Sequence, residues 1–185
     1  EKLLWIIGKS GCGKSTFLSM VAGIRPINNG QIKLTINKKF KKNQSKFIHQ
    51  YIAYMPQNPI FHSIKVVDYI KDGDTYIDNS QIKMILKKLK ISDSFNMNET
   101  KLLDQVIGPR GYNPSGGQAK LLSFARALCK RNVYLYLLDE PTSDLSEEYK
   151  EIVLNAIFEI AKEKFVLCIT HDLNAISSNQ QILSL

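Results

Sequence analysis

The chain has 185 residues, of which 44% are hydrophobic and 23% are charged. This balance suits one globular domain with its own hydrophobic core, and it excludes a disordered or collagen-like chain. The three cysteines are too few and too widely spaced for a disulfide framework or a zinc site. No apolar run reaches the roughly 18 residues of a membrane span. We therefore expect a soluble globular domain from a reducing compartment.

The formal net charge is +8, and most of the excess is lysine. One lysine cluster falls at residues 38–46 and reads as a solvated loop, and a second falls at 83–90 on the polar face of a predicted helix. Neither cluster is interleaved with the aromatic residues typical of single-strand binding. No nucleic-acid partner is expected.

The hydrophobic pattern predicts strands and helices that alternate along the chain. The first part holds a buried strand at 3–7, a helix at 17–22 that Gly23 ends, a half-exposed antiparallel strand at 32–36, the lysine-rich loop and a strand at 51–55. The last part holds a buried strand at 133–138, a helix at 147–160, a buried strand at 165–169 and the start of another strand at 182–183. Such alternation is typical of an α/β fold with parallel strands.

Residues 63–130 are predicted to be mainly helical. Ile82, Ile85, Leu86 and Leu89 follow the spacing i, i+3, i+4, i+7, which gives one apolar stripe with lysines opposite. Ser80 is the expected N-cap of that helix. The same spacing recurs later at Leu121, Phe124, Ala125 and Leu128.

Residues 8–15 fit the pattern G-x-x-x-x-G-K-[ST] without a mismatch. Glycines let the backbone curl so that successive N–H groups point at phosphate oxygens, and the following helix adds its N-terminal partial positive charge. Lys14 supplies a point charge for the β- and γ-phosphates, and the Ser15 hydroxyl can bind Mg²⁺. The expected phosphate-binding residues are Gly8, Lys9, Ser10, Gly11, Cys12, Gly13, Lys14, Ser15 and Thr16.

Two adjacent carboxylates, Asp139 and Glu140, follow the apolar run at 133–138. A carboxylate at the C-terminal end of a parallel strand faces the crevice where ligands bind. One carboxylate can hold Mg²⁺, and the other can polarise a water for in-line attack on a γ-phosphate. The alternative, an acidic pair that only caps the next turn, is weakened by the phosphate loop in the same chain.

Ser115, Gly116, Gly117 and Gln118 precede the second apolar stripe. A serine and two glycines at a helix start form another anion site, because the N–H groups are exposed and few side chains obstruct them. The chain thus carries two phosphate-binding helix starts. A single nucleotide rarely needs both from the same molecule.

These motifs resemble those of the nucleotide-binding domains of ATP-binding-cassette (ABC) proteins, and the resemblance covers essentially the whole chain. Six motifs follow one another in the family's order. They are the Walker A loop at 8–15, the Q-loop glutamine Gln57, the signature motif at 115–118, the Walker B pair Asp139 and Glu140, the D-loop at 142–145 and the switch histidine His171.

The resemblance implies that two such domains pair head to tail around two ATP molecules. Each ATP would lie between the Walker A loop of one domain and the signature residues Ser115 to Gln118 of the other. Glu140 would be the general base, His171 would contact the γ-phosphate, and Gln57 would touch Mg²⁺ and report the nucleotide state to a partner. The implied cofactors are ATP and Mg²⁺, with Ser15, Gln57 and Asp139 as the metal ligands.

The resemblance also implies a transmembrane partner, fused or separate, that docks near Gln57 and the helical insert at the cytoplasmic face of a membrane. Residues 105–111 are similar to the x-V-G-E-R-G segment of exporter-type domains, and residues 56–61 resemble the exporter Q-loop. These segments favour an exporter over an importer, although Pro109 stands where the family usually has glutamate.

Several positions depart from the family pattern. Pro114 replaces the usual leucine of the signature, which bears on how that loop meets ATP, and Ser146 replaces the usual D-loop aspartate. Family members carry further strands and an adenine-stacking aromatic residue before the Walker A strand. We expect Trp5 to be a core residue, not that aromatic, and the chain to be a piece of a longer domain.

The expected fold is an α/β P-loop NTPase (RecA-like) core with a parallel sheet, a partial antiparallel β subdomain and a helical insert. The single ABC domain at 1–185 would divide into a core at about 1–57 and 131–185 and a helical subdomain at about 58–130. Two other functions stay open, a soluble ABC ATPase of translation or DNA maintenance and a non-hydrolysing regulatory cassette. The short separation of Lys14 and Ser115 argues against the DNA-maintenance type, and the presence of Glu140 argues against the regulatory one.

Overall fold

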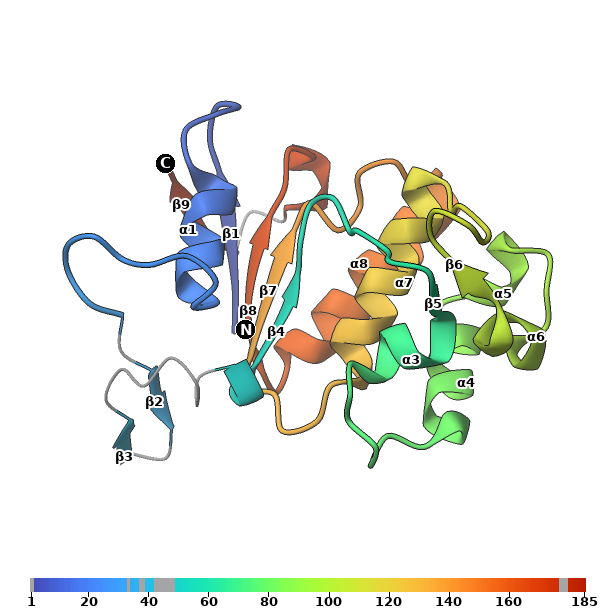
Figure 1. Ribbon diagram of the computed structural model, residues 1–185. Coiled ribbons are helices and arrows are strands. Elements are labelled where there is room, and N and C mark those ends of the chain that lie inside the picture. Colours follow the sequence, from blue (N-terminus) through green and yellow to red (C-terminus); the bar gives the residue numbers. More distant parts are fainter. Residues whose placement is uncertain (1, 33, 37–38, 42–48, 177–179) are drawn as a thin grey trace.

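The computed structural model describes residues 2–32, 34–36, 39–41, 49–176 and 180–185. A central five-stranded sheet has the spatial order β4-β7-β8-β1-β9, and every neighbouring pair in it is parallel (Figure 1). The predicted α/β fold with a parallel-sheet core is therefore confirmed. The strands of this sheet are β1 (Leu3–Ile7), β4 (Ile52–Met55), β7 (Leu135–Asp139), β8 (Phe165–Ile169) and β9 (Gln181–Ser184).

Helices and two small antiparallel sheets surround this core. The helices are α1 (Lys14–Val21), α3 (Val66–Lys71), α4 (Asn79–Lys88), α5 (Ile91–Ser94), α6 (Glu99–Asp104), α7 (Gly116–Cys129) and α8 (Glu147–Ala161), with 3-10 turns η1 (His49–Tyr51) and η2 (Leu173–Ala175). The small sheets pair β2 (Leu34–Ile36) with β3 (Lys39–Lys41) and β5 (Ile64–Lys65) with β6 (Val106–Ile107).

Side chains alternate between the two faces of the sheet, because successive residues of a strand point in opposite directions. Leu137 packs with Leu18 of α1 in one hydrophobic cluster. Leu138 belongs to a larger cluster that also includes Phe124 of α7 and Trp5. Trp5 is fully buried, which confirms its expected place in the core.

Helices α3 to α6 gather on the side of the molecule away from α1, with α7 between them and the sheet (Figure 1). The predicted apolar stripe explains this packing, since Ile82, Leu86 and Leu89 are fully buried. Within the described ranges, no helix combines the length and the apolar character that a membrane crossing requires.

The helix after the phosphate loop ends as expected. Gly23 has a φ of 74° and its N–H bonds to the Met20 carbonyl at 3.0 Å. Glycine adopts this left-handed conformation at little cost, so it follows the last helical turn readily.

Two local predictions were wrong. Lys39–Lys41 forms strand β3, not a loop, because its backbone pairs with β2 in an antiparallel register and such pairing overrides the weak strand preference of lysine. Helix α4 begins one residue before Ser80, after the extended N-cap Asp78, and the Ser80 hydroxyl donates to the Asp78 carboxylate. Lys38, Lys42 and Lys46 lie outside the described residues.

Candidate functional site

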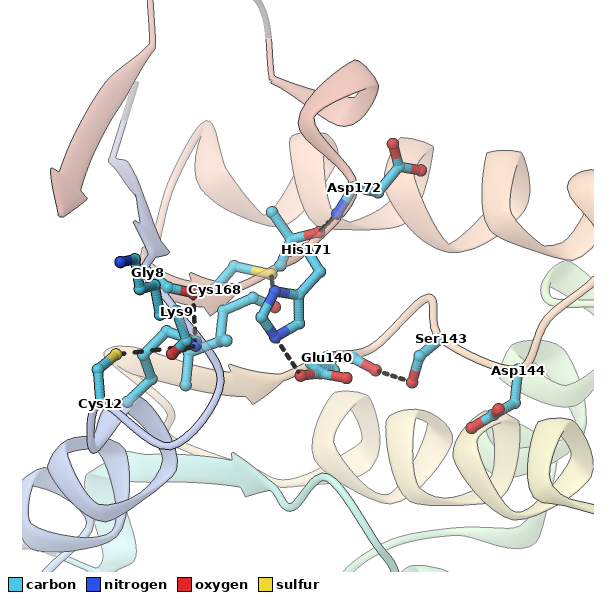
Figure 2. A network of polar contacts seen from close by, with 12 residues as sticks. Gly8, Lys9, Cys12, Glu140, Ser143, Asp144, Cys168, His171 and Asp172 are labelled. Atoms are coloured by element: carbon cyan, nitrogen blue, oxygen red, sulfur yellow. Dashed lines mark hydrogen bonds and ion pairs between the residues drawn. The ribbon is translucent and has the colours of Figure 1, made fainter. Parts of the chain in front are cut away.

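The order of the strands collects the predicted site residues at one edge of the sheet. Strands β4, β7, β8 and β1 are neighbours and run in the same direction, so their carboxyl ends lie side by side. Gln57 follows β4, Asp139 ends β7, Glu140 comes next, and His171 follows β8. The phosphate loop at 8–15 follows β1, and Figure 2 shows its start beside Glu140 and His171.

The phosphate loop turns through two glycines with left-handed backbone. Gly11 has a φ of 81° and Gly13 a φ of 102°, and a Cβ on either would meet no other atom within 4 Å. These glycines are therefore required by the backbone conformation and not by lack of space. The turned backbone leads directly into α1, whose N-terminus adds partial positive charge.

Lys14 is folded into the loop that precedes it. Its side chain is buried, and its Nζ donates to the Gly8 carbonyl at 2.9 Å and to the Lys9 carbonyl at 3.0 Å. Cys12 is exposed, and its sulfur lies 3.9 Å from the Lys14 Nζ. The loop therefore holds a positive charge at its centre, as a triphosphate site requires.

Asp139 is a buried carboxylate without a hydrogen-bond partner. It is 1% exposed, and neither of its carboxylate oxygens has a partner among the described residues. Burial raises the pKa of Asp139, and the Glu140 charge raises it further. The Ser15 hydroxyl lowers this pKa as a nearby polar group, although its distance and angle do not make it a hydrogen-bond partner. Unpaired carboxylate oxygens beside a hydroxyl suit Mg²⁺, which takes oxygen ligands and uses few protein groups when phosphates supply the others.

The described residues contain no group of three or more His, Cys, Asp or Glu side chains that could hold a metal ion by itself. Gln57 is half-buried and lines a cavity of about 370 Å³ at the start of α7, one strand away from Asp139.

Glu140 and His171 are in direct contact. Their side-chain atoms Oε1 and Nε2 lie 3.0 Å apart, with Glu140 15% exposed and His171 49% exposed (Figure 2). Glu140 has a φ of 50°, a left-handed conformation that few residues other than glycine adopt. A carboxylate in this position can accept a proton from a water, with the imidazole beside it.

The signature segment forms the capped start of α7. The Ser115 hydroxyl accepts a hydrogen bond from the Gln118 N–H at 3.3 Å, and the Gln118 side-chain oxygen accepts one from the Ser115 N–H at 3.0 Å. The Gln118 amide also donates to the Ser94 carbonyl at 2.6 Å. The helix begins normally after Pro114, because a proline before the first turn removes no intrahelical hydrogen bond.

The signature segment and the phosphate loop stay apart within one chain. Gly116 lines the same cavity of about 370 Å³ as Gln57 and Asp144. In the part of the chain that the structure describes, no hydrogen bond or ion pair joins residues 115–118 to residues 8–15. The structure therefore brings the loop, Asp139, Glu140 and His171 together, and leaves the second anion-binding helix start elsewhere.

One residue of this region escaped the sequence analysis. Lys120 of α7 is 3% exposed, and its Nζ donates to the Glu140 carbonyl at 2.8 Å. The signal was present, because Lys120 lies four residues before Phe124 and so shares the buried face of the helix. No motif marks Lys120, because its acceptors lie in a turn far along the chain.

The motifs and this geometry agree with the comparison of the chain with known families. Residues 1–143 match the family model described as ABC transporter. The chain belongs to the ABC transporter family. The resemblance seen in the sequence is therefore confirmed, and nucleotide binding follows from membership of this family.

Related ABC proteins match almost the full chain. It is 32% identical over 184 residues to the ATP-dependent lipid A-core flippase of Photobacterium profundum. This match covers 98% of this chain and 31% of the relative. It is 31% identical over 184 residues to multidrug resistance protein 1 of Entamoeba histolytica. This match covers 98% of this chain and 14% of the relative. The chain thus spans about a third or less of the length of these relatives.

A solved structure shares the fold. It is described as a bacterial Atm1-family ABC exporter with ATP bound, and it superposes with a TM-score of 0.84 at 23% identity over 99% of this chain and 32% of that one. This likeness supports the P-loop NTPase fold of the ABC domain.

Proposed function

We propose that this chain is the ATP-binding and ATP-hydrolysing motor domain of an ABC exporter. The observation that carries the proposal is the contact between Glu140 and His171 beside the phosphate loop, at 3.0 Å across the ends of β7 and β8. A proton acceptor and an imidazole at the phosphate end of the loop suit in-line attack of water on a γ-phosphate. Two of the relatives are a flippase and a multidrug resistance protein, which supports export as the direction of transport.

In the proposed reaction the loop N–H groups and Lys14 bind the β- and γ-phosphates. Ser15, Asp139 and Gln57 would hold Mg²⁺, which neutralises phosphate charge when it is bound. Glu140 accepts the proton of the attacking water through its carboxylate. His171 keeps that carboxylate oriented and contacts the γ-phosphate from the neighbouring strand.

The separation of the two anion-binding helix starts supports a head-to-tail pair of domains. Each ATP would then lie between residues 8–16 of one copy and residues 115–118 of the other. We further propose a core at about 1–57 and 131–185 and a helical subdomain at about 58–130. A transmembrane domain would dock near Gln57 and hold the motor at the cytoplasmic face of the membrane.

Phosphate release by the full-length protein tests the catalytic assignment. We expect Glu140→Gln to lower the turnover number by roughly 10²- to 10⁴-fold, the usual contribution of a general base, while ATP still binds. Glu151→Gln is a matched control, because Glu151 is an exposed residue of α8. Unchanged turnover in Glu140→Gln would show that Glu140 is not the base.

A further inference from the structure

A buried lysine packs against the turn at residues 140–144, which we call the catalytic turn because it begins with Glu140. Lysines are seldom fully buried in proteins. The Lys120 side chain is 3% exposed, and it reaches out of α7 toward the residues that follow β7. Burying an ammonium group is costly unless acceptors and opposite charges surround it. Burial lowers the pKa of Lys120, and the carboxylates of Asp144, Glu140 and Asp139 oppose that change.

The acceptors of Lys120 all belong to one short turn. Its Nζ donates to the Glu140 carbonyl at 2.8 Å and to the Ser143 hydroxyl, and it lies 4.0 Å from the Asp144 carboxylate. The Ser143 hydroxyl in turn donates to the Glu140 carbonyl at 3.2 Å (Figure 2). Several donors therefore converge on one oxygen, the carbonyl of the proposed catalytic base.

This carbonyl belongs to a residue in an uncommon backbone conformation. Glu140 has a φ of 50°, and a non-glycine residue keeps such a conformation only where its surroundings hold it. The backbone of Glu140 sets the direction of its side chain toward His171. A donor that fixes the carbonyl therefore also fixes where the carboxylate points.

The start of α7 packs tightly against the same turn. A Cβ on Gly117 would lie 2.8 Å from the Asp144 carbonyl oxygen, so no side chain fits between them. Ser115, the N-cap, and Lys120 are joined by the rigid first turns of one helix. Movement of the signature serine relative to Glu140 would have to break the contacts of Lys120.

We propose that Lys120 is a positioning residue for Glu140, which it holds through the Glu140 carbonyl and the Ser143 hydroxyl. It also links this turn to helix α7, which carries Ser115. Binding of the partner copy's ATP by Ser115 therefore affects the catalytic turn at this chain's own ATP site. The proposal rests on the proposed function, because Glu140 must be the base for its position to affect turnover.

The test compares two substitutions at one position in the full-length protein. Lys120→Met keeps the length of the side chain and removes the donors, whereas Lys120→Gln keeps two N–H donors without the charge. We expect Lys120→Met to lower the turnover number by roughly 100-fold, the loss that a misplacement of about 1 Å can produce, with ATP affinity unchanged. Lys120→Gln should recover most of the lost turnover. Lys162→Met is the control, because Lys162 pairs only with the exposed Glu159 among the described residues.

Each outcome bears on the proposal. Wild-type turnover in Lys120→Met would overturn it, and so would equal losses in the Met and Gln variants with ATP affinity falling in step. If Lys120→Met does not fold, Ser143→Ala decides, since reduced turnover at unchanged ATP affinity supports the proposal and unchanged turnover overturns it. A wild-type protein that hydrolyses no ATP would instead refute the proposed function.

Discussion

Glu140 and His171 meet across the carboxyl ends of two neighbouring strands, with Oε1 and Nε2 3.0 Å apart. The last residue of β7, Asp139, pairs with Ile169 of β8, so the residues that follow the two strands leave the sheet side by side. The contact therefore arises from the sheet register. It gives the proposed base a fixed neighbour in place of bulk water.

Removing that neighbour should affect the chemical step more than binding. We expect His171→Ala to lower the turnover number by roughly 100- to 1,000-fold, the range for removing one polar group at a reacting centre, with ATP affinity nearly unchanged. Steady-state phosphate release and equilibrium ATP binding measure the two quantities. His49→Ala, at an exposed histidine of η1, is the matched control. A large loss of ATP affinity with normal turnover would contradict the assigned role.

Because the Asp139 carboxyl is buried, we expect its removal to stabilise the folded protein by an amount that depends on pH. Burial raises the pKa of Asp139 above its ordinary value of 3.8, so the folded chain holds this proton more tightly than the unfolded chain. The stability that this group contributes is fully present below pH 3.8 and is lost as the pH rises through the raised pKa. The asparagine of the Asp139→Asn variant does not ionise in this pH range, so the variant does not lose this stability as the pH rises.

In the presence of EDTA, we expect Asp139→Asn to melt above the wild type at pH 7.5, by about 2–4 °C for each kcal/mol gained. The difference should shrink as the pH falls toward about 4. Thermal unfolding across this pH range measures it, and Asp104→Asn is the control because the Asp104 side chain is 71% exposed. A lower melting temperature for Asp139→Asn at pH 7.5 would count against the unpaired, buried carboxylate.

The three cysteines should react very differently with a maleimide. Cys12 is exposed on the phosphate loop, whereas burial raises the pKa of Cys129 to about 12 and that of Cys168 well above its ordinary value. Because the thiolate is the reactive form, we expect alkylation of Cys12 alone at pH 7.5.

ATP should protect Cys12, since it lies within the loop that binds phosphate. Peptide mapping by mass spectrometry, with and without ATP and Mg²⁺, measures both effects, and Cys12→Ser is the control. Labelling of Cys12 that ATP leaves unchanged would argue against nucleotide at this loop.

The central sheet could be predicted from the sequence because its strands are continuous apolar runs. The runs at 3–7, 133–138 and 165–169 each became a parallel strand, and the phosphate loop follows the first of them as expected. The strand at 39–41 could not be predicted, since three residues are too few to give a period-2 signal and only pairing with β2 makes it a strand.

The candidate site was predictable where a motif has a fixed spacing and not where it depends on tertiary contact. In residues 8–15 the spacing of the glycines indicates the turn of the phosphate loop directly. The buried Lys120 carries no motif, and its acceptors lie 20 or more residues away along the chain. Such a contact follows from how α7 packs against the turn after β7.

The most direct measurement mixes two inactive variants of the full-length protein. Lys14→Met damages the phosphate loop and Gly116→Asp damages the signature segment, so each variant alone should lack turnover. Co-expression with two affinity tags and purification through both yields mixed pairs, in which one site combines an intact loop with an intact signature. We predict that ATP hydrolysis returns in these pairs and stays absent when both substitutions sit on one chain paired with a wild-type copy. Turnover that is absent from the first pair and present in the second would contradict a site shared head to tail.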